Sequence, residues 1–563
     1  MSYYGNVNPE LLGIIPLTSQ RILELGCGAG ALGREFLRRN PEATWVGVEV
    51  VEEIGLQARS ELHQVLIGDC EAPGFFDQFD QPFDCIVAGD VLEHLRDPWT
   101  VLSSIERLLT PTGSLCICVP NIGHISIVKG LLQGKFTYAD SGLLDRTHLR
   151  FFTRESILQS LKQTGFQPEL LIPRRVLKDE TAARALLDAL DLMAQSPQAD
   201  QQAFSDLNSF QFVIRSHRQD RSPEGVRLVI AMLAMAPSFA DVRTREPLAA
   251  LGTLPGVKTH YFERDFQIPN YPINVPKIAI VQRQLVLDSD AWALSIEKLH
   301  QRGWKIVAEW DDHPDLFAPE IRAKFDRHPW ASVLMADAVQ VSTPALASHI
   351  QSVATSQGKT LNLKVVENRV LRMNALERSP VSGRKLRIFL GALNRGDQFS
   401  RLLDVILNHP FLGNQVEITV ISNDTQRAPM SGVTLLPPCD RRTYLNHLSE
   451  ADICVCPLED SAANRCKSPV KWLEAASVGT VVLASRVVYG TVIREDSDGL
   501  LFDDIQEVPD LIIRLIEAPD QIKRLRDHAI ERIRRNFMLA NDLDDRMGWY
   551  LEVARQTQPL QGS

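Results

Sequence analysis

Short apolar runs alternate with helical stretches along most of the chain, beginning at Arg21. Runs rich in β-branched and aromatic residues predict strands, because such side chains suit a pleated, buried surface. In the N-terminal part we expect strands at Arg21–Leu25, Thr44–Val48, Gln64–Ile67, Phe83–Ala88 and Ser114–Val119. Their alternation with helices indicates a parallel sheet covered by helices on both faces. A helical insertion around Ala182–Ala194 then leads to one more strand at Phe210–Ile214.

Two polar stretches interrupt this pattern and predict domain boundaries. The first, Ser216–Gly225, predicts a linker, and the second is a break around Ser379–Arg384 that contains Pro and Gly. We therefore expect a first domain at residues 1–217, a linker at 218–226, a second domain at 227–380 and a third at 381–563.

The second and third domains repeat the same alternation. In the second domain we expect strands at Arg227–Met232, Lys277–Val281, Lys305–Ala308, Ala338–Val341 and Leu363–Val366. In the third we expect them at Leu386–Leu390, Val416–Ile421, Val433–Leu435, Asp452–Cys456 and Thr480–Ala484. The predicted fold class is α/β, with three doubly wound Rossmann-like units in series.

The tail from Val508 to Gln556 is expected to be helical. Helical spacing places four apolar residues on one face: Ile522, Leu525, Ala529 and Ile533. The segment Lys523 to Arg535 is rich in arginine, and its charges lie off that apolar face. A solvent-exposed helix face is the simpler interpretation, and contact with an anionic membrane is the alternative.

Composition narrows the class of protein further. The chain has 563 residues, 44% hydrophobic and 23% charged, as in a globular protein of several domains. With a net charge of −10, the chain lacks the overall positive potential that attracts a polyanion, so we expect no nucleic-acid partner. Nine cysteines without a Cys-x-x-Cys pair indicate reduced thiols in a cytoplasmic protein. Met1–Glu10 lacks signal-peptide character, and the longest apolar run, Leu228–Ala240, is shorter than the roughly 20 residues that span a bilayer.

The most informative segment is Glu24-Leu25-Gly26-Cys27-Gly28-Ala29-Gly30, between an expected strand and an expected helix. Glycines let the backbone turn tightly and approach a ligand where a Cβ would collide. At the end of the next strand, Glu49 is placed to accept both hydrogen bonds of a ribose diol. A structural turn is the alternative for the glycines alone, and their combination with Glu49 favours a nucleoside site.

This segment resembles the class I S-adenosylmethionine-dependent methyltransferases, which carry Gly-x-Gly-x-Gly after an acidic residue. The resemblance continues in Ile67-Gly68-Asp69-Cys70, Asp84-Cys85-Ile86-Val87, Val119-Pro120-Asn121 and the run from Asp145 to Thr153. Between them, Gly89-Asp90-Val91-Leu92-Glu93-His94-Leu95 is similar to the quinone-type and sugar-type O-methyltransferases.

The resemblance implies that the first domain binds S-adenosylmethionine and methylates a hydroxyl group. It implies these cofactor-binding residues: Glu24 and Gly26 at the methionine moiety, Gly28 and Gly30 in the same loop, Glu49 at the ribose, Asp69 at the adenine, and Cys70 and Asp90 nearby. An alcohol acceptor must lose its proton, so His94 and His148 are candidate bases, with a structural hydrogen bond as the alternative for each. Because no His, Asp and Glu cluster shows metal-ligand spacing, we expect metal-free transfer.

A second candidate site lies in the third domain, in the segment from Asn464 to Thr480. Ser468 is expected to cap a helix whose first turn contains Pro469, which makes the helix N-terminus an anion site with Lys467 beside it. Glu474 lies about two turns further along, placed for hydroxyl groups. Gly479 is expected to end the helix, and an ordinary capped helix is the alternative interpretation.

With its surroundings, this segment resembles the nucleotide-sugar site of two-lobed GT-B glycosyltransferases of the group-one kind. The resemblance spans roughly Arg227 to Gln556, so residues 227–380 are implied to be the acceptor lobe and 381–563 the nucleotide-sugar lobe. Further segments carry it: Glu309–Asp312, Ala336–Pro344, Val366–Val370, Phe389–Gly396, Ala451–Ile453 and Ser497–Phe502.

The second resemblance also implies roles for single residues. It implies that the nucleotide sugar is bound by Gly391, Arg395, Lys467, Ser468 and Glu474, with Glu474 at the ribose. Arg395 and Lys467 would neutralise the leaving diphosphate without a metal ion. Two positions depart from the family pattern: Cys466 replaces the first Glu of a Glu-x7-Glu pair, and Ala392 replaces a common Arg. Asp311 and Asp312 are expected either to orient an acceptor hydroxyl or to form a turn after a strand.

Together these patterns predict a bifunctional enzyme of polysaccharide or surface-glycoconjugate biosynthesis. It would use S-adenosylmethionine and a nucleotide-diphosphate sugar to modify a glycan or lipid-linked glycan, since tethering raises the concentration of one module's product at the other. We expect it in the cytoplasm or peripherally at the inner face of the membrane. The alternatives are a small-molecule O-methyltransferase with a non-catalytic GT-B module, and a scaffold whose lobes sense glycan length.

Overall fold

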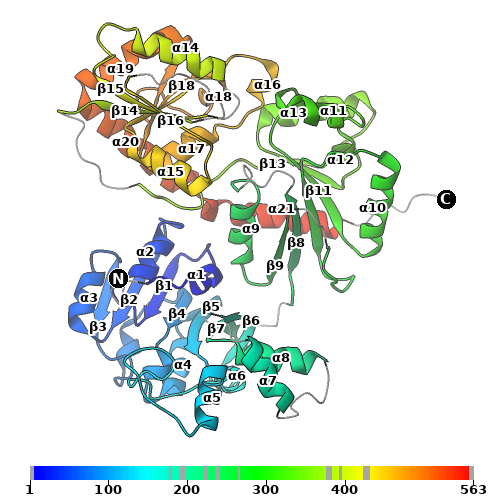
Figure 1. Ribbon diagram of the computed structural model, residues 1–563. Helices are drawn as coiled ribbons and strands as arrows, with labels where there is room; N and C mark the ends of the chain where they lie inside the picture. The colour runs from blue at the N-terminus through cyan, green and yellow to red at the C-terminus, as the bar shows by residue number, and fades with distance from the viewer. Residues whose placement is uncertain are drawn as a thin grey trace. The chain divides into compact units, whose positions relative to one another are not determined.

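The computed structural model describes residues 6–175, 180–189, 197–220, 225–234, 241–263, 267–375, 383–391, 396–422 and 431–556. The chain divides into two compact units (Figure 1). The first unit contains Met1–Gly225 and Gly252–Val257, and the second contains Val226–Leu251 and Lys258–Ser563.

The first unit is built on a seven-stranded sheet with the strand order β3-β2-β1-β4-β5-β7-β6. Its strands are β1 (Arg21–Leu25), β2 (Thr44–Glu49), β3 (Gln64–Ile67), β4 (Phe83–Gly89), β5 (Leu109–Pro120), β6 (Phe166–Arg174) and β7 (Gln211–Arg218). Strands β1 to β5 pair in parallel, and β7 is antiparallel to both β5 and β6. The carboxyl ends of β1, β2 and β4 therefore share one edge of the sheet, where ligands of such sheets bind.

Helices connect these strands (Figure 1). They are α1 (Pro9–Ile14), α2 (Ala31–Leu37), α3 (Glu52–Ala58), α4 (Pro98–Glu106), α5 (Ile125–Leu132), α6 (Arg154–Gln163), α7 (Glu180–Ala189) and α8 (Pro197–Leu207). The short 3₁₀ helix η3 (Leu92–His94) follows β4 directly. Helix α1 packs against β5 and β7, and α6 packs against β6. The core contains fully buried residues such as Leu23, Ile86, Leu115 and Ile157.

The five predicted N-terminal strands are confirmed, and the end of this sheet differs from the prediction. The sequence analysis missed β6, an edge strand that contains Pro168 and Pro173 and is half-buried along most of its length. Proline is tolerated in edge strands but masks them in a sequence pattern. Strand β7 continues to Arg218, so Ser216 and His217 belong to a buried strand rather than to the predicted linker. Residues 221–224 of that linker lie outside the described residues.

The second unit contains two six-stranded sheets, with the orders β13-β12-β11-β10-β8-β9 and β16-β15-β14-β17-β18-β19. The first has β8 (Leu228–Ala234), β9 (Val257–Phe262), β10 (Lys277–Gln282), β11 (Lys305–Trp310), β12 (Ala338–Val341) and β13 (Leu363–Val365). The second has β14 (Leu386–Gly391), β15 (Val416–Ile421), β16 (Val433–Leu436), β17 (Ile453–Cys456), β18 (Val481–Ser485) and β19 (Leu500–Phe502). The predicted strands are confirmed, whereas the short edge strands β9 and β19 were missed.

Helices of the second unit separate these strands. They are α9 (Arg245–Gly252), α10 (Ser289–Gln301), α11 (Pro319–Phe325), α12 (Ala331–Leu334), α13 (Pro344–Ser356), α14 (Gly396–Leu407), α15 (Arg441–Glu450), α16 (Ala462–Arg465), α17 (Val470–Ser477) and α18 (Arg486–Tyr489). The chain is therefore a mixed α/β protein with three mostly parallel sheets, as the sequence predicts.

The tail is helical as predicted, in α19 (Val508–Glu517), α20 (Pro519–Asn536) and α21 (Leu543–Arg555). The predicted apolar face of α20 is buried: Ile522, Leu525, Ala529 and Ile533. Helix α21 returns to the first sheet of the second unit, where it packs against β10. There the Tyr550 hydroxyl donates to Oε1 of Gln340 on β12 at 2.8 Å.

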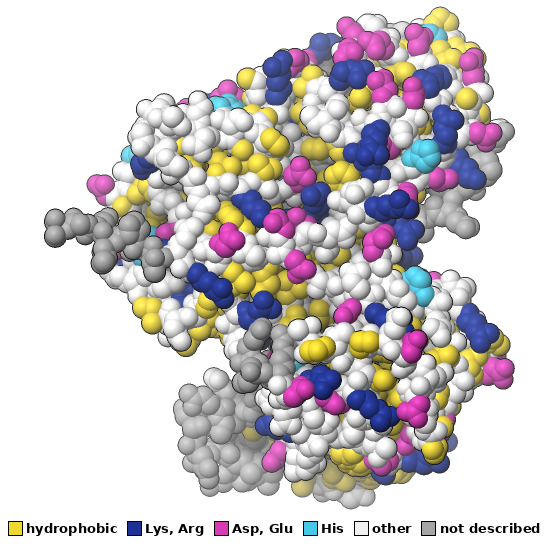
Figure 2. Space-filling model, turned by 180° about the vertical axis from the view of Figure 1, so that it is seen from behind, with side chains coloured by type: hydrophobic (Ala, Val, Ile, Leu, Met, Phe, Trp, Pro, Cys, Tyr) yellow, Lys and Arg dark blue, Asp and Glu magenta, His cyan; other side chains and the backbone are white. Residues whose placement is uncertain are grey.

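Two surface properties bear on the expected partners. Across the described ranges, none of the helices combines the length and apolar character that a membrane span requires. On the face drawn in Figure 2, basic and acidic side chains are interspersed over the described surface. The expected absence of a nucleic-acid partner stays a prediction.

Candidate functional site

The glycine loop after β1 has the backbone conformation that its sequence predicts. Gly26, Gly28 and Gly30 have φ angles of 65°, 53° and 79°, in the left-handed region that side-chain-bearing residues avoid. A Cβ on Gly26 would lie 2.5 Å from Cγ2 of Val91, so the loop also packs closely against the segment after β4. Gly30 is the N-cap of α2.

Glu49 ends β2 and is hydrogen-bonded to this loop. Its Oε2 accepts from the Gly28 amide at 2.9 Å, and its Oε1 accepts from the Val51 amide at 3.0 Å. A carboxylate has about four acceptor positions, so each oxygen retains capacity for a hydroxyl donor. The structure thus brings Glu49 to the glycine loop, and its ribose contact stays a prediction.

Glu24 lies behind the loop on β1 and is buried. Trp45 donates from Nε1 to Oε2 of Glu24 at 2.9 Å. The pKa of Glu24 is raised to about 8, mainly by burial; the Trp45 hydrogen bond opposes this shift, and the charge of Glu49 adds to it. Glu24 therefore holds a proton near neutral pH until a positive charge approaches.

Asp69 and Cys70 follow β3 and have different environments. Asp69 accepts from the Glu71 amide at 2.8 Å and pairs with Arg96 at 3.2 Å on the surface. Cys70 packs against the core, and burial raises the pKa of its thiol to about 12. Cys70 is therefore a packing residue in this structure, whereas Asp69 faces solvent and is 43% exposed.

Asp90 follows β4 with a left-handed φ of 55°. Its Oδ1 accepts from Nε2 of Gln211 at 2.5 Å, and its amide donates to the Cys118 carbonyl at 3.0 Å. Burial raises the pKa of its carboxyl group. This left-handed turn is followed by Val91, whose side chain lies against Gly26 of the glycine loop, and then directly by η3.

His94 and His148 come from separate segments and meet in the structure. Their ring centroids lie 4.8 Å apart in an edge-to-face arrangement. The amides of Leu149 and Arg150 both donate to the Glu93 carbonyl, at 2.7 and 2.9 Å, and so join the two segments. Burial and then the charge of His94 lower the pKa of His148, which keeps its imidazole neutral near pH 7.

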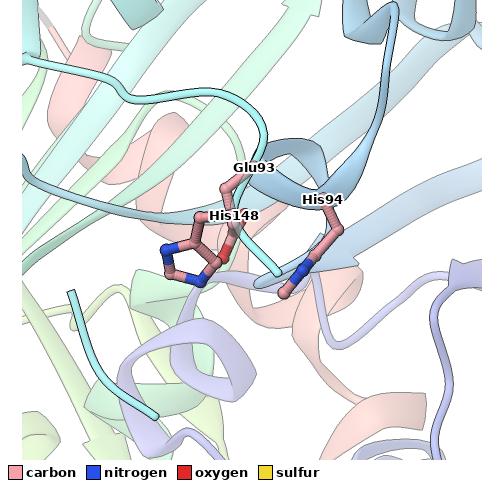
Figure 3. Close-up of side chains that lie close together, drawn as sticks. All are labelled: Glu93, His94 and His148. Atoms are coloured by element: carbon pink, nitrogen blue, oxygen red, sulfur yellow. The ribbon is translucent and has the colours of Figure 1, made fainter. Parts of the chain in front are cut away.

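Glu93, which was not predicted as a site residue, lies between these two imidazoles (Figure 3). Its side chain is 1% exposed, and neither carboxylate oxygen has a hydrogen-bond partner among the described residues. Burial raises its pKa well above the usual value, and the charge of Asp90 adds to this effect. Its position directly before His94 was the only sequence signal.

An exposed aromatic surface adjoins His148, and the sequence analysis also missed it. The Phe151 ring lies 6.5 Å from that of His148, Phe136 lies 6.0 Å from Phe151, and Tyr138 lies 5.5 Å from Phe136. The three rings are 37%, 40% and 52% exposed, respectively. Such a surface suits an acceptor with an apolar or ring-shaped face.

In the second unit, α17 begins one residue later than predicted. Its N-cap is Pro469, so the prediction of Ser468 as the cap is wrong. Ser468 instead accepts a hydrogen bond at Oγ from Nδ2 of Asn368 at 2.7 Å. Lys467 lies 3.6 Å from Oδ1 of Asp312. Gly479, with φ of 74°, follows the C-cap as expected.

Glu474 on α17 is buried and ionised. Burial opposes ionisation, but Lys471 and Arg441 outweigh it and lower the pKa of Glu474. Lys471 donates from Nζ to Oε2 at 3.0 Å, and Arg441 donates to Oε1. Arg441 also pairs with Glu246 at 3.1 Å. Both oxygens of the predicted ribose ligand thus already bind cations, and the sequence analysis assigned no role to Arg441 or Lys471.

Gly391 at the end of β14 lies beside this cluster. A Cβ there would collide with the Phe389 ring and lie 2.7 Å from Cε2 of Tyr444. The Tyr444 hydroxyl accepts a hydrogen bond from Lys471 at 3.0 Å, which connects Gly391 to Glu474. The other predicted phosphate ligand, Arg395, lies outside the described residues, as does Ala392.

The remaining predicted positions lie near Lys467. Asp311 and Asp312 are both bound by Arg283, which the sequence analysis missed; the Asp312 contact is 2.8 Å. Cys466 is buried, and its carbonyl accepts from Oγ1 of Thr343 at 2.9 Å. The position of the missing acidic residue is therefore occupied by a buried thiol in a packed segment.

Comparison with known proteins identifies two domains in the chain. Residues 8–171 match the model of a methyltransferase domain, and residues 385–518 match the model of group 1 glycosyl transferases. The protein is a transferase that contains an S-adenosylmethionine-dependent methyltransferase domain and a group 1 glycosyltransferase domain.

Each curated relative that we compared matches about a third of the chain or less. Ubiquinone biosynthesis O-methyltransferase of Paracidovorax citrulli is 25% identical over 202 residues, which are 32% of this chain and 82% of the relative. Malonyl-[acyl-carrier protein] O-methyltransferase of Geobacter sulfurreducens is 28% identical over 152 residues, 26% of this chain and 55% of the relative. Among solved structures, TarM aligns with 13% identity and a TM-score of 0.36, over 50% of this chain and 55% of TarM.

Proposed function

We propose that this protein transfers a methyl group and a glycosyl group in the biosynthesis of one glycan. The two activities would reside in separate units, one binding S-adenosylmethionine and the other a nucleotide-diphosphate sugar. The observation that carries the proposal is a pair of closely packed glycines, Gly26 after β1 and Gly391 at the end of β14, where a Cβ would collide with neighbouring side chains. Each glycine lies at the carboxyl end of a central strand, beside a cluster of charged side chains.

The residues of the first unit fit S-adenosylmethionine. Its positively charged sulfonium supplies an activated methyl group, and the site around it is rich in carboxylates. Gly26, Gly28 and Gly30 would admit the cofactor to the backbone, and Glu49 would accept from its ribose. Glu24 would become ionised near the positive charge, because a cation lowers the pKa that burial raises. Asp69 would bind the adenine amino group, next to Cys70 and Asp90.

On the acceptor side, His94 and His148 are the residues that would activate the hydroxyl group. The neutral imidazole of His148, beside an exposed aromatic surface, suits the deprotonation of a ring-bearing acceptor. The Phe136, Tyr138 and Phe151 side chains would hold that acceptor by stacking against its apolar face.

In the second unit, the cations around α17 would bind the diphosphate of the sugar donor. Lys467, Arg441 and Lys471 are basic side chains near Ser468 and Glu474. A diphosphate that displaces Asp312 from Lys467 would gain a charge-assisted hydrogen bond, and its charge would be neutralised as it leaves. Arg395 and Gly391 would complete this site, and Glu474 would accept from the ribose on its remaining lone pairs.

The acceptor would be a glycan or a lipid-linked glycan, handled in the cytoplasm or at the inner face of the membrane. The decisive experiment incubates the full chain with labelled S-adenosylmethionine, a panel of nucleotide sugars and glycan acceptors. We expect both labels in one product. Methylation of a non-sugar compound, together with no sugar transfer to any glycan, would overturn the proposal.

The second candidate is a small-molecule O-methyltransferase whose glycosyltransferase part only binds. Two observations favour it: Cys466 is a buried thiol where the family has a Glu, and the first relative is named for ubiquinone biosynthesis. Lys467→Ala discriminates the two, because the second candidate predicts unchanged product chemistry, whereas the first predicts loss of glycosyl transfer.

A further inference from the structure

Glu93, His94 and His148 form a compact cluster of side chains of the types that can bind a metal ion, two of them just after β4 and the third from a separate segment. One potential ligand atom from each residue lies within 4.8 Å of the other two. Figure 3 shows the Glu93 carboxylate between the two imidazole rings. Three ligands of one transition-metal ion, each about 2.1 Å from it, lie about 3.4 Å apart in a tetrahedral site. The three atoms lie within 4.8 Å of one another, so a shift of under about 1 Å in each side chain brings all three onto one ion.

The buried carboxylate of Glu93, which has no partner among the described residues, is the observation that indicates a ligand. Its carboxylate is 1% exposed, and neither oxygen has a hydrogen-bond partner within the described part of the chain. A buried carboxylate without a partner costs several kcal/mol, and native proteins satisfy such groups with a donor or a cation. A metal ion between Glu93 and the two imidazoles would satisfy both oxygens.

Both histidines are also held in the manner of metal ligands. Nδ1 of His94 lies 3.2 Å from the Thr147 carbonyl oxygen, and Nδ1 of His148 lies 3.3 Å from the Leu143 carbonyl oxygen. Donation from Nδ1–H to a carbonyl leaves the lone pair on Nε2, the tautomer that a ligand needs. Asp145 supports this geometry, because its Oδ1 accepts from the amide and the hydroxyl of Thr147 at 2.8 and 2.7 Å.

We propose that Glu93, His94 and His148 bind one divalent transition-metal cation, such as Zn²⁺, Mn²⁺ or Fe²⁺. Two imidazoles and one carboxylate select this class over Mg²⁺ and Ca²⁺, which prefer oxygen ligands. Three protein ligands leave further coordination positions open to a small molecule. The proposal departs from the metal-free transfer expected from the sequence, because the ligands lie in two segments more than fifty residues apart.

The ion would bind the acceptor hydroxyl and would replace the free imidazoles as the group that activates it, because each imidazole would then be a metal ligand. This role rests on the methyl transfer proposed above. The acceptor hydroxyl binds the cation through its oxygen, and its proton passes to solvent water because the cation lowers the hydroxyl pKa. That oxygen then forms the new C–O bond while the C–S bond of the sulfonium breaks, with its electron pair kept by sulfur. A vicinal diol or catechol would bind best, because its two oxygens fill two open positions.

Cobalt titration of the full chain tests the site without any acceptor. After treatment with a chelator, the protein is titrated with Co²⁺ and followed by visible absorption, and Zn²⁺ binding is measured by calorimetry. We expect one equivalent to bind in the wild-type protein. Glu93→Gln, which keeps the side-chain volume, and His148→Ala are each expected to weaken binding at least about 100-fold. His528→Ala, at an exposed position of α20, is the control and is expected to change nothing.

The outcomes separate this proposal from the proposed function. Absence of Co²⁺ and Zn²⁺ binding, or binding that survives both Glu93→Gln and His148→Ala, would overturn the metal site. Binding of S-adenosylhomocysteine by each variant shows that the fold is intact, because that ligand is measured independently of the metal. A wild-type protein that binds one Co²⁺ here but methylates no acceptor keeps the site and overturns the methyl-transfer function instead.

Discussion

Both candidate sites contain buried carboxylates, but the pKa of Glu474 in the second unit is shifted in the opposite direction to those of Glu24 and Glu93 in the first. In the first unit, burial raises the pKa of Glu24 to about 8 and raises that of Glu93 well above its usual value. In the second, burial acts in the same direction on Glu474, but Lys471 and Arg441 outweigh it and lower the pKa. Within the described residues no cation pairs with Glu24 or Glu93, whereas two pair with Glu474.

This difference indicates the charge of the ligand that each unit is built to receive. A site with unpaired buried carboxylates becomes more stable when a cation enters, and the sulfonium of S-adenosylmethionine or a metal ion is such a cation. A site whose buried carboxylate is already neutralised by two basic residues can offer those cations to an anion. The diphosphate of a sugar donor is such an anion.

The largest effects are expected from adding a Cβ to the closely packed glycine of one unit while leaving the other unit unchanged. Gly26→Ala introduces a Cβ 2.5 Å from Val91 at a φ of 65°, so we expect methyl transfer to fall more than about 100-fold. Gly391→Ala collides with Phe389 and Tyr444, and we expect the corresponding loss in glycosyl transfer. Each activity is measured in both variants with labelled donors.

Gly13→Ala is the matched control, because nothing lies within 4 Å of the added Cβ and the residue is helical. We expect it to leave both activities unchanged. Loss of both activities in either single loop variant would contradict the assignment of one activity to each unit.

The sequence predicted the glycine loop of the first unit, because the backbone conformation there depends on residues close together in the chain. Three glycines that need left-handed φ angles, and a strand before them, are visible in the letters themselves. The end of the first sheet was mispredicted for a physical reason. Ser216 and His217 are polar but buried in β7, where strand pairing with β5 and β6 satisfies their backbone. Only tertiary contacts reveal that.

The charge state of each site depends on residues distant in sequence, and the sequence could not show it. Arg441 reaches Glu474 from another helix, 33 positions away, and His148 reaches Glu93 from a separate loop. The same holds for Ser468, whose side chain binds Asn368 across 100 positions instead of capping its own helix. Local spacing predicted which residues matter, and folding decides their partners.

The next-largest expected effect is on stability, and it compares the carboxylates of Glu474 and Glu93. Glu474→Gln leaves Lys471 without its carboxylate, so we expect the free energy of unfolding to fall by about 2 kcal/mol in urea denaturation. In chelator-treated, metal-free protein Glu93→Gln removes no partner, and we expect no loss near pH 7. The control is Glu450→Gln, since Glu450 is 70% exposed and its pairing with His447 contributes little. Equal losses in the variants at 474 and 93 would contradict the comparison.

Opposite pH dependences follow from the opposite pKa directions. The pKa of Glu24 is raised to about 8 on folding, so the folded chain holds an extra proton between roughly pH 4.3 and pH 8. Its contribution to stability therefore falls as pH rises through this range, by up to about 1.4 kcal/mol per pH unit. For Glu474, whose pKa is lowered, the contribution is present above the unfolded value and is lost as pH falls.

Denaturation of the wild-type protein and of Glu24→Gln across this pH range measures the first effect. We expect the variant to show a smaller decrease in stability toward pH 8, since glutamine does not titrate. Parallel pH profiles for the two proteins would show that Glu24 is not the titrating group.

The smallest expected effect is a loss of ligand affinity without a loss of stability, at an exposed ion pair of the first unit. Asp69 and Asp77 form similar exposed ion pairs, with Arg96 at 3.2 Å and Arg107 at 3.3 Å. Each pair contributes under about 0.5 kcal/mol because solvent screens it, so neither Asp69→Ala nor Asp77→Ala should shift the unfolding midpoint appreciably. Only Asp69 lies in the loop proposed to hold the adenine, and Asp69→Ala should therefore weaken S-adenosylhomocysteine binding about fivefold in calorimetry. Equal affinities in the two variants would show that Asp69 does not bind the adenine. The adenine would then have no carboxylate partner in this loop, because Glu71 already accepts hydrogen bonds from the Arg96 and Asp97 amides.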